Sequence, residues 1–269
     1  MQHTFFIAPT EIKTGLTSIT LGLIRTLDQL GLKVATCKPI ANFEDNHRHR
    51  SIAMIHYATG IEPPQPITLT HAQAMVGSGK IDRLMEDVVA MHHTVAAQAD
   101  VVIVEGIDPD RNQPYTAKLN VEMAKTLNAQ VILVAAPQGR NPKQLEEHIH
   151  MTQGLYSTGK NSNLLGVIIN KVNAPNNPAV PIKDQAIVSG NGTSTQLAMN
   201  ELSKLDSPHF KVLGLIPWDA NLVAPRMEDI ARYLQASYLN DHKPQGPRVS
   251  RISLCARTVP NMVSTLTPG

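Results

Sequence analysis

The chain has 269 residues, of which 42% are hydrophobic and 17% are charged, so it can bury a full core and does not have the composition of a disordered polymer. Its formal net charge is +2 and only 4% of its residues are aromatic, which argues against a nucleic-acid surface built from basic runs and stacking rings. No apolar run approaches the roughly 20 residues of a membrane span, and the N-terminus lacks the pattern of a secretion signal. We therefore expect a cytoplasmic protein with no nucleic-acid and no membrane partner.

Six short apolar runs, each rich in Val, Ile or other large apolar residues, predict strands. In chain order they occupy residues 4–8, 34–37, 101–106, 131–136, 164–170 and 211–218. The runs are continuous rather than alternating, so both faces of each strand are expected to be buried, as in a parallel sheet covered by helices.

Helical spacing of apolar residues separates these runs. The predicted helices cover residues 16–30, 81–97, 120–129 and 142–155, and Gly31 follows the first of them as a stop. The repeated strand–helix order predicts an α/β fold: a doubly wound, mostly parallel sheet with helices on both faces.

Three stretches interrupt this pattern. The proline-rich residues 61–69 predict a loop, and the polar residues 173–196 predict a long connection or insertion. Residues 241–248, DHKPQGPR, have the composition of a linker, and a strand-like run follows them. The predicted organisation is therefore a domain at 1–240, a linker at 241–248 and the first piece of a second domain at 249–269.

The cysteines and histidines suggest no redox or zinc chemistry. Cys37 and Cys255 lie far apart in apolar runs, which indicates two buried thiols in a reducing compartment. The histidine pairs at 92–93 and 148–150 do not have the spacing of three or four residues that places side chains on one helical face. No zinc site is predicted.

The stretch APTEIKTGLTSIT, residues 8–20, connects the first predicted strand to the first predicted helix. A phosphate-binding loop has this setting, and Gly15 and Thr17 stand where such a loop places its last glycine and its Mg²⁺-binding hydroxyl. Leu16 stands where the loop has its lysine. Backbone N–H groups at the start of the helix attract an anion even without a lysine. The same glycine and threonine also suit a plain turn and helix cap.

Polar residues at other predicted strand ends extend this candidate site. Lys38 follows the second strand, Glu105 ends the third before Asp108 and Asp110, and Asn170 ends the fifth. The carboxyl ends of parallel strands share one edge of the sheet, so a lysine and a carboxylate beside an anion-binding loop match the needs of a Mg²⁺–nucleotide complex. The alternatives are a surface lysine and a turn cap for Lys38 and Asn170. Glu105 is harder to assign a passive role, since a buried unpaired carboxylate is costly.

These motifs, in this order, resemble the long bacterial phosphate acetyltransferases. The similar stretches are APTEIKTGLTSITLGLIRTLDQLGLKVATCKPIA, DVVIVEGIDPDRNQPYTAKLNVEMAKTLNAQVILV, LLGVIINKVNAP and VLGLIPWDANLVAPRMEDIARYL, and RVSRISLCARTVPNM resembles the opening of that family's middle domain. The resemblance implies a P-loop NTPase-like domain similar to dethiobiotin synthetase, with the C-terminal acetyltransferase domain missing. The family interconverts acetyl-CoA plus phosphate with acetyl phosphate plus CoA. Its N-terminal domain is associated with assembly and allosteric response, so the implied partners are a small-molecule effector and further copies of the chain.

The related dethiobiotin synthetases have a loop reading Gly-Thr-Asp-Thr-x-Val-Gly-Lys-Thr, which implies roles for individual residues. Pro9 replaces the first glycine and Leu16 the lysine, and leucine is usual at this position in the acetyltransferases. His49 stands where that family commonly has an aspartate, which removes one carboxylate from the implied metal site. The resemblance implies ATP or NADH with Mg²⁺ as ligand and Thr17 and Glu105 as metal ligands. The implied binding set is Thr10, Lys13, Thr14, Gly15, Thr17, Ser18, Lys38, Glu105 and Asn170.

Three functions remain open at this point, and no residue is assigned a catalytic role. The first is a regulatory and assembly domain with a degenerate nucleotide loop, which Leu16 favours. The second is a working ATP-dependent ligase of the dethiobiotin synthetase or cobyrinate amidase type, which Thr17, Lys38 and Glu105 favour. The third is an interaction module that only holds subunits together.

Overall fold

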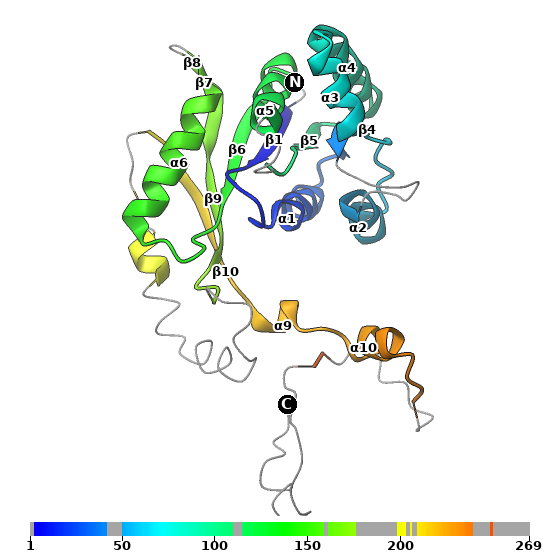
Figure 1. Ribbon diagram of the computed structural model, residues 1–269, viewed down its shortest axis with the longest axis vertical. Helices are drawn as coiled ribbons and strands as arrows, with labels where there is room; N and C mark the ends of the chain where they lie inside the picture. The colour runs from blue at the N-terminus through cyan, green and yellow to red at the C-terminus, as the bar shows by residue number, and fades with distance from the viewer. Residues whose placement is uncertain are drawn as a thin grey trace, which may run out of the picture.

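The computed structural model describes residues 3–41, 50–109, 115–158, 161–175, 198–202, 205, 209–238 and 248–249. Within these residues, six strands form one parallel sheet in the order β10-β9-β6-β1-β5-β2 (Figure 1). The strands are β1 (His3–Pro9), β2 (Val34–Cys37), β5 (Val101–Glu105), β6 (Gln130–Ala135), β9 (Leu164–Val172) and β10 (Val212–Pro217). The helices around them are α1 (Leu16–Gln29), α2 (Arg50–Thr59), α3 (Leu69–Gly77), α4 (Ile81–Ala96), α5 (Tyr115–Thr126) and α6 (Pro142–Tyr156).

The chain winds outward from β1 in both directions. It first crosses through α1 to β2 at one edge, and β5 then pairs between β2 and β1. From β5 it crosses to β6 on the other side of β1, and continues outward through β9 to β10. All five pairings are parallel, which confirms the predicted doubly wound fold. The order reverses at β1, so the loop that follows β1 lies where such sheets bind ligands.

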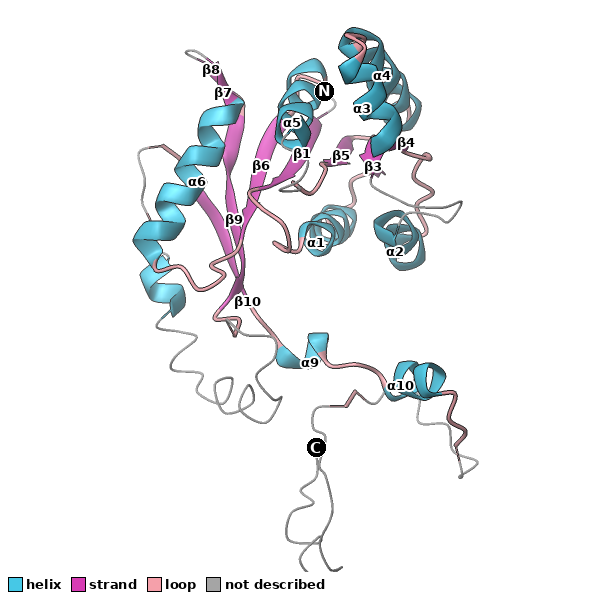
Figure 2. Cartoon of the chain, in the orientation of Figure 1, coloured by secondary structure: helices cyan, strands magenta, loops and turns pink. Residues whose placement is uncertain are grey.

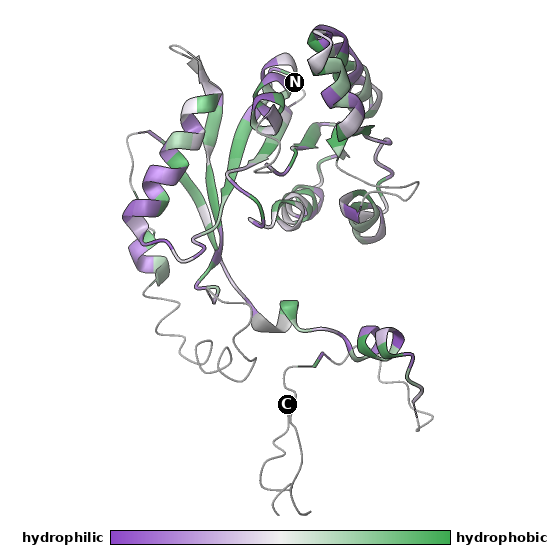
Figure 3. Ribbon diagram, viewed as in Figure 1, coloured by the Kyte–Doolittle hydropathy of each residue, from purple (hydrophilic) through white to green (hydrophobic). Residues whose placement is uncertain are grey.

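Two apolar layers cover the two faces of the sheet. On one face Ile7, Ile103 and Ile132 pack with residues of α1 and α2. On the other face Phe6 and Val104, with further strand residues, pack with α3, α4, α5 and α6. The strands run as apolar segments between helices whose outer faces are more polar (Figures 2 and 3). Neighbouring strand residues thus enter opposite layers, which is why the strand sequences are apolar throughout.

Most predicted elements form close to their predicted bounds, and the main differences are local. The helix predicted at 120–129 is α5, which begins at Tyr115 and ends at Thr126. The loop predicted at 61–69 is wrong for its last three residues: Ile67 and Thr68 form β4 (Ile67–Thr68), which pairs with β3 (Ile40–Ala41), and α3 begins at Leu69. Proline has no backbone N–H, and Ile67 is the first residue after the last proline of this stretch. The backbone N–H of Ile67 donates to the carbonyl of Pro39. The Thr68 side chain then caps α3.

The part of the chain after β10 leads away from the sheet (Figure 1). It contains α9 (Ala220–Val223) and α10 (Met227–Leu234), and none of the α10 residues is buried. The Arg248 guanidinium donates to the carbonyls of Leu222 and Ala224. A short antiparallel pair, β7 (Ser157–Thr158) and β8 (Asn161–Ser162), precedes β9. Residues 239–247 and 250–269 lie outside the described residues, so the proposed linker and second domain stay predictions.

No helix in the described ranges combines the length and apolar character that crossing a membrane requires.

Candidate nucleotide-binding site

The loop between β1 and α1 ends in an uncovered helix N-terminus. Gly15 precedes α1 with φ 84°, a left-handed conformation that glycine adopts without strain. The amide nitrogen of Asn170 occupies the space that a Cβ of Gly15 would need. Among the residues that the structure describes, no side-chain hydrogen bond caps α1 at this end, and its first turn holds no acidic residue. Its free N–H groups and positive dipole end therefore face the loop, as an anion-binding site requires.

The residues that follow β9 hold the loop from one side. Asn170 donates from Nδ2 to the carbonyl oxygen of Thr14 at 2.8 Å, and its Oδ1 accepts from the backbone N–H of Lys171 at 2.9 Å. Lys171 donates from Nζ to the carbonyl oxygen of Lys13 at 2.6 Å. Lys13 itself has φ 64°, which is unusual for a residue with a side chain. Burial, together with the charge of Lys13, lowers the pKa of Lys171.

The residues between β6 and α6 hold the loop from the other side. Arg140 binds both carboxylate oxygens of Glu11, at 2.6 and 2.8 Å, and the amide of Gln138 donates to the carbonyl of Ile12 at 2.9 Å. The hydrogen bond and charge of Glu11 raise the pKa of Arg140. Two parallel hydrogen bonds between a guanidinium and a carboxylate fix the relative orientation of the two groups as well as their distance. Arg140 therefore sets the position of the first half of the loop.

Glu105, at the end of β5, is the centre of a buried polar cluster beside the loop. Its Oε1 accepts from the ammonium of Lys38 at 2.7 Å and from the hydroxyl of Thr17 at 3.1 Å. Lys38 also donates to the carbonyl of Gly106 at 3.2 Å. Three residues far apart in the sequence thus meet because β1, β2 and β5 are neighbours that end at the same edge. Partial burial raises the pKa of Asp108, Glu105 raises it further, and Lys38 opposes this.

Three buried oxygens at this site have no hydrogen-bond partner among the described residues. They are Oε2 of Glu105 and the hydroxyls of Thr10 and Thr14. A buried polar atom without a partner costs free energy, so such atoms point to a ligand. The two hydroxyls and the helix end suit a phosphate group, and a carboxylate oxygen beside the Thr17 hydroxyl suits Mg²⁺. On this donor set, the residues fit a Mg²⁺-bound phosphate ligand.

Leu16 belongs to the core and not to the loop surface. It is 3% exposed and packs with Ile19, Ile24 and strand residues on the α1 face of the sheet. The position at which a phosphate-binding loop presents its lysine therefore serves as an apolar anchor for the start of α1. Within the described residues, the buried ammonium at this edge is that of Lys38, and it is already paired.

The structure brings together most of the predicted binding residues. Thr17, Lys38 and Glu105 form one cluster, and Thr14, Gly15 and Asn170 form another. Thr10 lies buried at the start of the loop, whereas Lys13 and Ser18 are exposed. Asp110 and His49 lie outside the described residues.

The sequence reasoning missed the residues that hold the loop. Glu11, Arg140 and Lys171 carry these contacts, and Arg140 and Lys171 follow predicted strands directly or within a few residues. Their position at the carboxyl ends of strands was the available signal.

Comparison with known families agrees with this geometry. A family model described as an AAA domain matches residues 3–226. The chain belongs to this AAA-domain family. The match includes the loop and every strand of the sheet, so the P-loop NTPase-like fold is confirmed.

The chain is also similar along its whole length to phosphate acetyltransferases. It is 39% identical over 270 residues to the enzyme of Pseudomonas aeruginosa, covering 100% of this chain and 37% of the relative. With the Escherichia coli enzyme the identity is 32% over 274 residues, covering 100% and 38%. The resemblance seen in the sequence is thus confirmed, and the chain spans little more than a third of the length of these relatives.

Solved structures resemble the chain only weakly. The MinD cell division protein of Aquifex aeolicus has a TM-score of 0.43 at 14% identity, covering 82% of this chain and 84% of that chain. The signal recognition particle receptor FtsY of Elizabethkingia anophelis has a TM-score of 0.45 at 14% identity, covering 65% and 52%.

Proposed function

We propose that this chain is the N-terminal regulatory and assembly domain of a phosphate acetyltransferase, and that its loop binds a phosphate-bearing metabolite such as ATP or NADH without turning it over. The observation that carries the proposal is the burial of Leu16 in the core beside an otherwise well-formed loop. The domain would occupy residues 1–240 and would act in the cytoplasm. It would regulate and assemble acetyltransferase domains that correspond to the part of the relatives that this chain does not cover.

Binding is supported by groups that do not depend on a lysine. The uncapped start of α1 and the hydroxyls of Thr10 and Thr14 would receive a phosphate. Thr17 and Glu105 would hold Mg²⁺, which would supply positive charge to the phosphate oxygens. Lys38 stands 2.7 Å from Glu105 and would move or share its carboxylate when the metal enters.

Turnover is disfavoured because α1, the helix that follows the loop, presents no lysine side chain to a bound phosphate. A lysine that contacts a transferring phosphate stabilises charge that develops during the reaction, and loss of one such group costs about 10²-fold or more in rate. Leu16 offers no such contact. The amide of Asn170, which is one of the predicted binding residues, donates to the loop carbonyl of Thr14.

A second candidate function is an ATP-dependent ligase of the dethiobiotin synthetase or cobyrinate amidase type. The Thr17–Glu105–Lys38 cluster favours it, since these residue types at these strand ends serve Mg²⁺ and phosphate in such enzymes. Formation of dethiobiotin from diaminopelargonic acid and bicarbonate, with ATP and Mg²⁺, would support this candidate over the regulatory domain.

The binding part of the proposal is tested by melting temperatures with ATP, ADP, NADH, acetyl-CoA and pyruvate, with and without Mg²⁺. A ligand at about 100 times its dissociation constant stabilises the fold by roughly 2.7 kcal/mol, which is about 5–10 °C for a domain of this size. We expect a shift with ATP or NADH that Thr14→Val reduces, and no release of phosphate from ATP. If none of these compounds shifts the melting temperature, the loop binds none of them and the ligand-binding part of the proposal is wrong.

The assembly part needs a separate measurement. Light scattering of this chain should give a mass above that of the monomer. A strict monomer at micromolar concentrations would contradict an assembly role for this domain and leave the ligand-binding role standing.

A further inference from the structure

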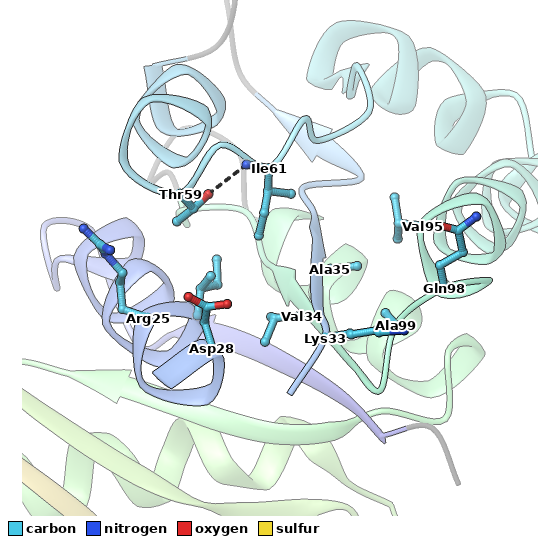
Figure 4. Close-up of a pocket in the computed structure, with 11 residues that line it drawn as sticks. Arg25, Asp28, Lys33, Val34, Ala35, Thr59, Ile61, Val95, Gln98 and Ala99 are labelled. Carbon is cyan, nitrogen blue, oxygen red and sulfur yellow. Dashed lines mark hydrogen bonds between the residues drawn. The ribbon is translucent and has the colours of Figure 1, made fainter. Parts of the chain in front are cut away.

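A second pocket lies at the opposite end of the sheet from the loop. It has a volume of about 370 Å³, within the range of roughly 300–1,000 Å³ that is usual for small-molecule sites. It is formed where the last turns of α1, α2 and α4 approach the first residues of the edge strand β2 (Figure 4). The lining residues are Ile24, Arg25, Asp28, Lys33, Val34, Ala35, Thr59, Ile61, Val95, Gln98 and Ala99.

The pocket has an aliphatic floor and a polar rim. Ile24, Val34, Ile61 and Val95 belong to the floor, and Figure 4 shows Asp28 on the α1 side of the pocket, between Arg25 and Val34. The rim side chains of Arg25, Asp28, Lys33 and Gln98 have no hydrogen-bond or ion-pair partner within the described part of the chain. Polar groups without a protein partner, arranged around an apolar surface, can orient a ligand.

The charged groups that line the pocket are of both signs: Asp28 is anionic, and Arg25 and Lys33 are cationic. Thr59 is the last residue of α2, Val95 is in the last turn of α4, and Asp28 is in the last turn of α1, so three negative helix ends meet here. The last turn of α1 contains no basic residue, whereas the last turns of α2 and α4 contain His56 and His93. The Asp28 carboxylate adds a full negative charge and Arg25 and Lys33 add two positive charges, so the lining offers partners for both an ammonium and a carboxylate.

The edge of β2 does not have room for an added strand. Val34 and Ala35 are half-buried and line the pocket, but Thr36 and Cys37 are each 1% exposed. A peptide that extended the sheet would need a longer accessible edge to form a regular ladder. The accessible surface is a short hollow, so a small molecule fits it better than a peptide.

We propose that this pocket binds a small aliphatic molecule that carries an ammonium group, such as an aliphatic amino acid. The ammonium would lie against Asp28 and the helix ends, and the aliphatic part would cover Ile24, Val34 and Ile61. Arg25 and Lys33 at the rim would accommodate a carboxylate. The site is separate from the loop, but α1 begins at the loop and ends at the pocket, so one rigid helix joins the two.

The test uses three probes of similar carbon skeleton: leucine, isoamylamine, which lacks the carboxylate, and 4-methyl-2-oxopentanoate, which lacks the ammonium. Melting temperatures are measured at millimolar concentrations of each probe. We expect leucine, which carries both charged groups, to stabilise the chain more than isoamylamine or 4-methyl-2-oxopentanoate, each of which lacks one of them. In Asp28→Asn the dissociation constant for leucine should rise by about tenfold or more.

Asp82→Asn is the matched control, because Asp82 is an exposed acidic residue at the other end of α4. It should bind leucine as the unchanged chain does. The proposal is overturned if leucine does not stabilise the chain, if the oxo acid stabilises it as much as leucine does, or if Asp28→Asn binds leucine as tightly as Asp82→Asn. None of these outcomes depends on the loop, so the proposal can fail while nucleotide binding stands.

Discussion

Lys38 and Glu105 form an ion pair that is almost completely shielded from water. The ammonium nitrogen lies 2.7 Å from the carboxylate, and the side chains are 4% and 0% exposed. The pair joins the ends of β2 and β5 immediately beside the loop, so the same contact contributes to the fold and to the charge of the candidate site.

Removal of one partner of this pair should destabilise the chain strongly. Lys38→Met leaves a buried carboxylate without its counter-ion, and we expect the free energy of unfolding to fall by about 3–5 kcal/mol. The double variant Lys38→Met with Glu105→Leu should lose much less than the sum of the two single variants, because neither charge remains. Urea unfolding measures all three. Additive losses would show that the two charges act independently.

Gly15 and Gly22 should respond in opposite ways to the same substitution. Gly15→Ala places a Cβ against the Asn170 amide and forces a left-handed backbone, so we expect a loss of about 1–3 kcal/mol and a weaker response to ATP or NADH. Gly22 lies within α1, and a Cβ there meets nothing within 4 Å. Gly22→Ala should therefore gain about 0.5–1 kcal/mol. A loss of equal size at both positions in thermal unfolding would refute the argument for Gly15.

His92 should make the stability of the fold depend on pH. It is buried, its Nε2 lies 3.0 Å from the Thr4 hydroxyl, and burial, with a further contribution from His93, lowers its pKa below the ordinary value of 6.5. Above that value the histidine is neutral in both states. As the pH falls below it, the unfolded chain takes up a proton that the folded chain resists, so the free energy of unfolding decreases.

This decrease should be smaller in His92→Gln, measured by urea unfolding between pH 7.5 and pH 5. The decrease should level off at lower pH, once the folded histidine is also protonated. An unchanged slope in His92→Gln would assign the pH dependence to other groups.

Cys37 should be inert in the folded chain. It is 1% exposed, and burial raises the pKa of its thiol to about 12. Since the thiolate is the reactive form, a Cys255→Ser variant should react with a thiol reagent at pH 8 at least about a hundredfold more slowly in buffer than in concentrated urea. Rapid reaction of the folded protein would mean that β2 opens readily or that the site is less closed than its burial indicates.

The sequence was sufficient to predict the sheet because each strand is buried on both faces. A continuous apolar run such as residues 101–106 is typical of a strand in a parallel sheet that helices cover on both faces. The alternation of such runs with helical segments therefore indicated the doubly wound fold. The helix at Arg50 and the short β3–β4 pair were not predicted, because their formation depends on contacts with distant residues. Ile67, for example, completes its backbone hydrogen bond with Pro39.

The candidate site was predictable in its residue types but not in its connections. Strand ends indicated that Lys38 and Glu105 would be neighbours, and the loop pattern indicated Gly15 and Thr17. No sequence pattern indicated that Asn170 would donate to the loop itself, or that Arg140 would reach back to Glu11. Such contacts follow from distances between loops, which a periodic pattern does not encode.

The place of Leu16 has a consequence for how such a loop can change over time. Substitution of Leu16 by lysine would remove the apolar anchor of α1, at a cost of about 2–5 kcal/mol by analogy with other large core losses, and would direct a charge toward the core. A domain has only about 5–15 kcal/mol of stability in total. A lysine at position 16 would therefore consume a large part of the stability of the domain. Introduction of a lysine for phosphate-transfer chemistry would first require another apolar anchor elsewhere along the helix.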